Sequence, residues 1–317
     1  MKKTAIIVGS AGQDGYYLTD QLADRGYNVV GVERDRIANA PPGLGSENPI
    51  FDQMTADRLV DASQPAEVYY LAAHHRSSED ESENAVLGFA RSFDVHVKGL
   101  LHFLEGIRKH CSTAKLFYAA SSHVFGNPRN VPQTEETPFD PVSVYGITKA
   151  SGVEICRMYR RDHDLSCSSG ILYNHESPRR GPAFIGQKIV KGAVAIKRGH
   201  SDSLVLGDLE AAIDWGDATD YARAMQAILS IDEAGEFVIA TGETHTVGEF
   251  VDIVFRNLDL STKRYVSENP NLLKKAERSR QLVGDVTKIK RLTDWRPSKN
   301  FQDIVRDLVE AELAATS

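Results

Sequence analysis

The stretch Gly9-Ser10-Ala11-Gly12-Gln13-Asp14-Gly15 decides the fold. It follows a short apolar run at residues 4–8, which is rich in β-branched side chains and predicts a buried parallel strand. Apolar residues then recur at helical spacing up to Gly26, a typical helix stop. The first glycine permits a tight turn, the second lets the backbone approach a pyrophosphate, and the third allows close helix packing. Strand, turn and helix together predict a dinucleotide site formed by Gly9, Gly12, Gln13, Asp14 and Gly15.

The end of the next strand indicates which dinucleotide binds. Residues 28–33 read as a second strand that ends at Glu33, 21 residues after Gly12. A carboxylate at this place accepts hydrogen bonds from the adenosine ribose and repels a 2′-phosphate. The adjacent Arg34 is either the residue that would meet a 2′-phosphate or a solvated surface cation. We therefore expect NAD as the cofactor, with NADP as the less favoured alternative.

The rest of the chain predicts an α/β fold. Two further strands, at residues 67–73 and 115–120, flank a helix expected over residues 90–110. Strands that alternate with helices predict a doubly wound parallel sheet of the Rossmann type. From about residue 171 the alternation becomes irregular, which predicts a smaller, inserted or C-terminal lobe, and residues 301–313 read as a closing amphipathic helix. We place the dinucleotide domain at residues 1–170, with part of residues 207–245 returning to it, and the substrate domain mainly at residues 171–317.

Length and composition exclude several classes of protein. The 317 residues correspond to two folding units at roughly 150 residues per domain. With 37 basic and 44 acidic residues the net charge is −7, which argues against a nucleic-acid-binding protein. No apolar run approaches the roughly 18 residues that a membrane helix needs. Cys111, Cys156 and Cys167 have no metal-ligand spacing, so we expect reduced thiols, no metal site and a cytoplasmic protein.

Tyr145 and Lys149 form the candidate catalytic pair. They stand four residues apart, on one face of a predicted helix. A nearby ammonium depresses the pKa of a tyrosine, so that the phenolate can take a hydroxyl proton while hydride leaves the same carbon. Lys149 is also suited to hold the nicotinamide ribose. Ser121 follows the strand at residues 115–120 and can reach the same hydroxyl, which completes a predicted catalytic set.

These motifs, in this order, resemble the extended short-chain dehydrogenase/reductase superfamily, whose members mostly modify nucleotide sugars. Within it, nearly the whole chain is similar to the GDP-mannose 4,6-dehydratase family. The similarity rests on residues 9–18, on residues 172–181, on residues 214–225, and on Gly284-Asp285 followed by Asp294-Trp295-Arg296-Pro297. The run Asn174-His175-Glu176-Ser177-Pro178-Arg179-Arg180-Gly181 is specific to that branch.

The resemblance implies a first step in which hydride passes from C4 of a hexose to the nicotinamide, with Tyr145 as the base. Family dehydratases then lose water across C5–C6 and return the hydride to C6. A glutamate serves as the second acid/base in that elimination, and His123 stands at its position in this chain. His123 is either a substitute acid/base, since imidazole titrates near neutral pH, or a structural histidine beside the cofactor.

The sequence is therefore compatible with three functions. The leading expectation is a GDP-mannose 4,6-dehydratase-like enzyme that acts by hydride transfer at hexose C4. The first alternative is a C4 dehydrogenase, epimerase or 4-keto reductase that uses the same Tyr145 and Lys149 on a GDP-sugar. The second is a non-catalytic, NAD-binding regulatory relative, against which the complete set of Ser121, Tyr145 and Lys149 argues.

The resemblance also implies ligand contacts. The family positions that contact the cofactor correspond to Leu71, Ala72 and Ala73, and to Asp52 beside the adenine. The family positions that contact the substrate correspond to His75, Ser122, Asn174, Glu176, Arg180, Lys188, Lys275 and Arg278. Ala212-Ile213 replaces two arginines that the family has near the diphosphate, and Arg179-Arg180 is either a structural pair or a ligand contact. The expected partner is a nucleotide-diphosphate sugar, GDP-linked.

The resemblance further implies a homodimer. Relatives commonly dimerise through a four-helix bundle, and the matching helices are expected at residues 90–110 and 145–162. Residues 34–42 match poorly the Arg-rich loop that builds larger tetramers, so we expect a dimer. His96 and His163 lack evident partners and are expected to be ordinary helix residues.

Overall fold

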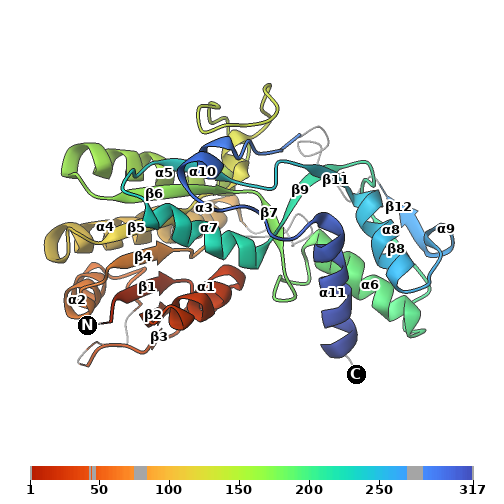
Figure 1. The fold of residues 1–317 in the computed structure, drawn as a ribbon, viewed down its shortest axis with the longest axis horizontal. Coiled ribbons are helices and arrows are strands. Elements are labelled where there is room, and N and C mark those ends of the chain that lie inside the picture. Colours follow the sequence, from red (N-terminus) through yellow and green to blue (C-terminus); the bar gives the residue numbers. More distant parts are fainter. Residues whose placement is uncertain (1, 43, 45–47, 75–83, 270–280, 316–317) are drawn as a thin grey trace.

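A seven-stranded sheet forms the centre of the larger lobe (Figure 1). The computed structural model describes residues 2–42, 44, 48–74, 84–269 and 281–315. Within them the strand order is β10-β6-β5-β4-β1-β2-β3, with every neighbouring pair parallel except β2 and β3. This confirms the predicted doubly wound parallel sheet. The strands are β1 (Thr4–Val8), β2 (Asn28–Val32), β3 (Ile37–Ala38), β4 (Glu67–Tyr70), β5 (Lys115–Ala119), β6 (Cys167–Leu172) and β10 (Glu236–Ile239).

Helices cover both faces of this sheet (Figure 1), which is why most residues of its strands are buried. On one face α1 (Gln13–Asp24) packs against α7 (Ala218–Ser230). On the other, α4 (Gly99–His110) packs against α2 (Gln53–Ser63) and α5 (Val144–His163).

The helix expected at residues 90–110 is interrupted. It consists of α3 (Ala85–Phe93), a π-helical turn η1 (Asp94–Lys98) and α4. Tyr70 explains the position of the break, because its hydroxyl donates to the carbonyl oxygen of Val95 at 2.5 Å. A Cβ on Gly99 would lie 2.3 Å from that same hydroxyl, so the phenol occupies the space beside the turn. Such π turns are frequent at functional sites.

A second hydrophobic core lies in the smaller lobe. Trp215, Phe250 and Phe301 pack at its centre, with ring centroids 4.8 to 6.3 Å apart. The lobe has a three-stranded sheet, β11-β9-β7, and a two-stranded sheet, β12-β8. Its elements are β7 (Asn174–Glu176), α6 (Ile185–Lys197), β8 (Leu204–Leu206), β9 (Ala212–Asp217), β11 (Thr244–Thr246), α8 (Val247–Asn257), α9 (Thr262–Tyr265), β12 (Val266–Glu268) and α11 (Phe301–Ala315).

The chain passes more than once between the two cores. After β9 it returns to the larger lobe as α7 and β10, and α10 (Thr287–Leu292) and Trp295 also join that core. Buried Asp220 stabilises the return of the chain toward α11, because its carboxylate accepts hydrogen bonds from the backbone and side chain of Ser298 at 2.6 Å. The exact domain boundaries given above stay a prediction. No helix in the described part of the chain is long and apolar enough to cross a membrane.

Candidate active site

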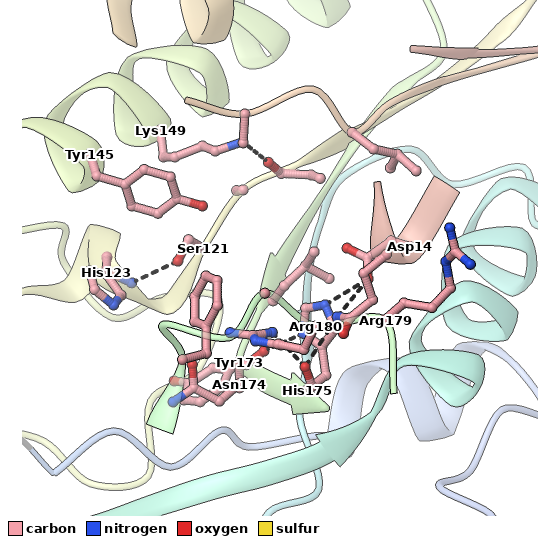
Figure 2. Close-up of a pocket in the computed structure, with 18 residues that line it drawn as sticks. Asp14, Ser121, His123, Tyr145, Lys149, Tyr173, Asn174, His175, Arg179 and Arg180 are labelled. Atoms are coloured by element: carbon pink, nitrogen blue, oxygen red, sulfur yellow. Dashed lines mark hydrogen bonds and ion pairs between the residues drawn. The ribbon is translucent and has the colours of Figure 1, made fainter. Parts of the chain in front are cut away.

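A pocket opens where the central strands end (Figure 2). One wall is formed by residues at or just after the carboxyl ends of β4, β5 and β6. The opposite wall is formed by β7 and the residues that follow it. Ligands of open parallel sheets bind at this edge. The pocket is lined by Gln13, Asp14, Leu71, Ala73, Ala119, Ala120, Ser121, His123, Tyr145, Lys149, Leu172, Tyr173, Asn174, His175, Arg179, Arg180, Gly181 and Phe184.

Helix α5 brings Tyr145 and Lys149 into the pocket from its first two turns (Figure 2). Ser143 caps this helix by accepting a hydrogen bond from the Gly146 backbone N–H at 3.1 Å. Gly146 is required for the close approach of α5 to the turn η2 (Ser122–Phe125), because a Cβ there would lie 2.5 Å from the carbonyl oxygen of His123. Lys149 is buried and donates to the carbonyl oxygen of Ala119 at 2.6 Å.

Burial sets the charge states of the Tyr145–Lys149 pair. It raises the pKa of Tyr145 to about 12, although a hydrogen bond with Ser121 and the charge of Arg180 oppose the rise. It lowers the pKa of Lys149 to about 7, against the opposing charge of Asp14. Without ligands, therefore, Tyr145 is a phenol at neutral pH and Lys149 titrates close to neutrality. Positive charge next to the phenol, such as protonated Lys149, favours the phenolate.

Two histidines contact the ring of Tyr145 edge-on. His123 lines the pocket with its ring centroid 5.6 Å from that of Tyr145. His96 lies 5.3 Å from the same ring, is completely buried, and places Nδ1 2.8 Å from the hydroxyl oxygen of Thr148. Its Nε2 accepts the backbone N–H of His74 at 2.9 Å. The expectation that His96 lacks partners is wrong, because the π turn directs it at α5, whereas His163 is exposed near the end of α5.

The glycine turn fits a dinucleotide. Gly9 has φ +96, a conformation that favours glycine, and a Cβ there would lie 2.9 Å from the backbone nitrogen of Ala72. A Cβ on Gly15 would lie 2.3 Å from the carbonyl oxygen of Gly9, so α1 can pack this closely only with glycine. Gly12 caps α1 without a side-chain hydrogen bond. The N-terminus of α1 is therefore suited to bind a phosphate.

Two of the residues expected at the adenosine end, Glu33 and Asp52, have protein partners. Glu33 follows β2 and forms two hydrogen bonds with the Arg36 guanidinium, at 2.8 and 3.2 Å. Arg34 is exposed. Asp52 caps α2 by accepting the backbone N–H of Thr55 at 2.7 Å.

The opposite wall comes from β7 and the segment that follows it. Figure 2 shows Tyr173, Asn174, His175 and Arg180 across the pocket from Tyr145. The Arg180 guanidinium lies 4.1 Å from the Phe184 ring centroid and donates to the carbonyl oxygen of His175 at 2.5 Å. The structure thus brings two cations, Arg179 and Arg180, to this pocket.

Several predicted ligand residues lie outside this lining. Ser122 is buried in η2, Ala72 is buried behind the pocket edge, and Lys188 lies on α6. Glu176 is 2% exposed, and a Cβ on Gly186 would lie 2.8 Å from its Oε2, so its carboxyl group packs against the start of α6. Burial raises the pKa of Glu176, with Arg180 opposing. His75, Lys275 and Arg278 fall outside the described residues.

Sequence reasoning missed other lining residues. The pocket lining includes Tyr173, His175 and Phe184, none of which was expected to contact a ligand. The first two adjoin or belong to the branch-specific run at residues 174–181, so the run as a whole was the available signal. Phe184 carries no such signal, since a lone aromatic residue after a glycine is equally typical of a core position.

A parallel Rossmann sheet with a glycine turn, with Ser121 after β5 and with Tyr145 and Lys149 on α5, defines an extended short-chain dehydrogenase/reductase. The sequence profile of the GDP-mannose 4,6 dehydratase family matches residues 6–308. The chain belongs to this family. GDP-mannose 4,6 dehydratase 2 of Arabidopsis thaliana is 36% identical over 333 residues, which cover 98% of this chain and 87% of that protein. The human GDP-mannose 4,6 dehydratase is 32% identical over 350 residues, or 98% of this chain and 92% of that protein.

Solved structures share the fold. RMD from Pseudomonas aeruginosa, complexed with NADPH, aligns with a TM-score of 0.84 at 18% identity, covering 99% of this chain and 100% of that chain. The dTDP-glucose 4,6-dehydratase of Bacillus anthracis, in complex with NAD, aligns with a TM-score of 0.81 at 19% identity, covering 98% of this chain and 97% of that chain. Both structures contain a nicotinamide dinucleotide, and both confirm the Rossmann-type fold predicted here.

Proposed function

We propose that this protein is an NAD-dependent enzyme that oxidises C4 of a GDP-linked hexose and then eliminates water, as a 4,6-dehydratase. The observation that carries the proposal is the meeting of Ser121, Tyr145 and Lys149 in one pocket with Asn174 and Arg180 of the opposite wall. Family membership supports the nucleotide-sugar substrate, because the curated relatives are GDP-mannose 4,6 dehydratases. The bound nicotinamide would supply the hydride acceptor.

Each residue of the set has a distinct role in this proposal. Tyr145 takes the proton of the C4 hydroxyl, because its phenol lies in the pocket and can act as a general base once nearby positive charge lowers its pKa. Ser121 donates a hydrogen bond to the same substrate oxygen. Lys149 stabilises the phenolate and holds the nicotinamide ribose. Arg179 and Arg180 line the pocket and are the proposed ligands of the diphosphate, because guanidinium groups bind phosphate oxygens well.

His123 is the proposed acid/base for the elimination. It lines the pocket beside Tyr145, at the position where the family has its glutamate. An imidazole can accept a proton from C5 and donate one to the leaving hydroxyl near neutral pH.

Replacing His123 tests this role. We expect the wild-type protein to convert GDP-mannose and NAD to a 4-keto-6-deoxy product, followed by NMR. His123→Ala should reduce water loss about 10²–10⁴-fold while leaving C4 oxidation in a single turnover. His123→Glu should restore elimination, and His200→Gln, at an exposed position, should behave as wild type. If the wild-type protein forms no 4-keto-6-deoxy sugar, the dehydratase function is wrong.

The replacement of the family glutamate also favours a second candidate. A C4 dehydrogenase, epimerase or 4-keto reductase needs Tyr145 and Lys149 but no second acid/base at residue 123. In that case the products would keep all their oxygen atoms, and the configuration at C4 would identify the reaction.

Two finer features of the enzyme are also proposed. NAD is the expected cofactor, because the Glu33 carboxylate follows β2 where a 2′-phosphate would lie. A cytoplasmic location is proposed from cysteine usage, because the three cysteines, Cys111, Cys156 and Cys167, cannot all pair within one chain.

A homodimer is proposed through α3 and α5, which contact each other. Leu87 and Phe89 on α3 and Ile147 on α5 are exposed by 55%, 42% and 43%, and a second copy of the chain would cover them. We expect a dimer in sedimentation velocity and a monomer for Phe89→Glu. A wild-type monomer at micromolar concentration would contradict this assembly.

A further inference from the structure

Two of the segments that carry the family resemblance, residues 9–18 and residues 172–181, contact each other. Gln13 in the glycine turn donates from Nε2 to the carbonyl oxygen of His175 at 3.2 Å and accepts the hydroxyl of Ser177 at 2.8 Å. Next to them, Nε2 of His175 lies 2.9 Å from Oδ1 of Asp14 (Figure 2). Side chains 161 residues apart in sequence thus join the start of α1 to β7.

The hydrogen bonds of His175 define its charge. Its Nδ1 lies 2.7 Å from the carbonyl oxygen of Tyr173, which can only accept. Burial alone would raise the pKa of Asp14, but the charge and hydrogen bond of His175, with help from Gln13 and Arg180, lower it instead. Asp14 is therefore a carboxylate, so both ring nitrogens of His175 face acceptors. This pattern is satisfied when both nitrogens carry hydrogens, which makes the His175–Asp14 pair an ion pair.

The ring of His175 is held from several sides. It stacks on the ring of Tyr221 at 4.5 Å and is 7% exposed. Gly216, its neighbour across the β7–β9 ladder, makes room for Tyr221, because a Cβ there would lie 2.3 Å from Cε2 of that ring. Glu176 and Arg180 are the other charged groups near the imidazole. Packing from β7, β9 and α7 therefore fixes the ring against Asp14.

The position of Asp14 explains why a cation is needed there. Asp14 is the second residue of α1, at the helix end where a pyrophosphate binds in Rossmann folds. An unpaired carboxylate at this end would repel the phosphates. We propose that His175 is a positioning residue that neutralises Asp14 and thereby makes tight dinucleotide binding possible. This inference rests on the proposed function, since it requires that the protein binds a nicotinamide dinucleotide.

A double-mutant cycle on NADH binding tests the proposal. Titrations of the full chain, followed by NADH fluorescence, compare wild type, His175→Gln, Asp14→Asn and the double variant. Glutamine keeps an N–H donor but removes the charge, so we expect His175→Gln to raise the dissociation constant about tenfold or more. The double variant should return to within about threefold of wild type, because the charge to be neutralised is gone. His200→Gln is the matched control at an exposed position.

The outcomes separate the possibilities. Equal affinity of His175→Gln and wild type would overturn the role of His175, and so would a double variant as weak as His175→Gln, which would indicate loss of packing. If His175→Gln does not fold, as judged by circular dichroism, the NADH affinity of Asp14→Asn decides the question. Affinity of Asp14→Asn equal to or higher than that of wild type supports the proposal, and a loss of affinity of tenfold or more overturns it. Failure of the wild-type protein to bind NADH or NADPH would instead overturn the proposed function.

Discussion

Replacing Tyr145 with phenylalanine is expected to lower the rate of hydride transfer about 10²–10⁴-fold, the range for loss of a general acid/base. Phenylalanine keeps the ring and its edge contacts with His96 and His123, at centroid distances of 5.3 and 5.6 Å. It removes only the hydroxyl that takes the proton from the substrate. Single-turnover reduction of NAD by the sugar nucleotide, followed by the absorbance of NADH, measures the effect.

Two controls make this result specific for catalysis. The variant should bind NADH like the wild-type protein and should unfold at a similar denaturant concentration. Tyr265→Phe, on α9 of the smaller lobe, should leave the rate unchanged. A rate for Tyr145→Phe within about threefold of wild type would show that another group is the base.

Replacing Lys149 with methionine is expected to stabilise the ligand-free protein, most of all at low pH. Burial lowers the pKa of Lys149 from 10.5 to about 7 in the folded protein. Between these values the unfolded chain binds more protons than the folded one, so the free energy of unfolding of the wild-type protein rises with pH. A difference of about 3.5 units corresponds to at most about 5 kcal/mol. The hydrogen bond to Ala119, worth about 1 kcal/mol, offsets part of the gain in the variant.

Urea unfolding at about pH 6 and about pH 9.5 measures this effect. The stability difference between Lys149→Met and wild type should be several kcal/mol at the lower pH and should shrink at the higher pH. Lys263→Met, at an exposed position, should show no such change. A difference that is the same at both pH values would mean that Lys149 stays charged in the fold. The variant should also be inactive, because it lacks the ammonium that favours the phenolate.

Much of the fold could be predicted because short local stretches of sequence determine several of its strands and its glycine turn. The four strands predicted from the sequence are short, mostly apolar runs, as in residues 4–8, and the glycine turn demands the φ of +96 found at Gly9. The proximity of Ser121, Tyr145 and Lys149 could also be predicted from the sequence. Parallel strands end at the same edge of a sheet, and residues four apart lie on the same face of a helix.

Other features depend on contacts between distant segments. His96 was expected to be an ordinary helix residue. The sequence around it does not predict the π turn η1, in which the carbonyl oxygen of Val95 accepts the hydroxyl of Tyr70. Burial of Glu176 against Gly186 depends on how α6 packs behind β7. The pairing of His175 with Asp14 needs the smaller lobe to meet the start of α1, which neither motif predicts alone.

The fate of deuterium at C4 of GDP-mannose tests the central claim most directly. Wild-type protein is incubated with NAD and GDP-mannose that carries deuterium at C4, and the products are analysed by NMR and mass spectrometry. We predict that the label leaves C4 and is recovered in the reduced nicotinamide or at C6 of a 4-keto-6-deoxy sugar, and that Tyr145→Phe prevents the transfer. A wild-type protein that binds NADH but returns the sugar with all deuterium at C4 and with the C4 configuration unchanged would contradict hydride transfer from this carbon.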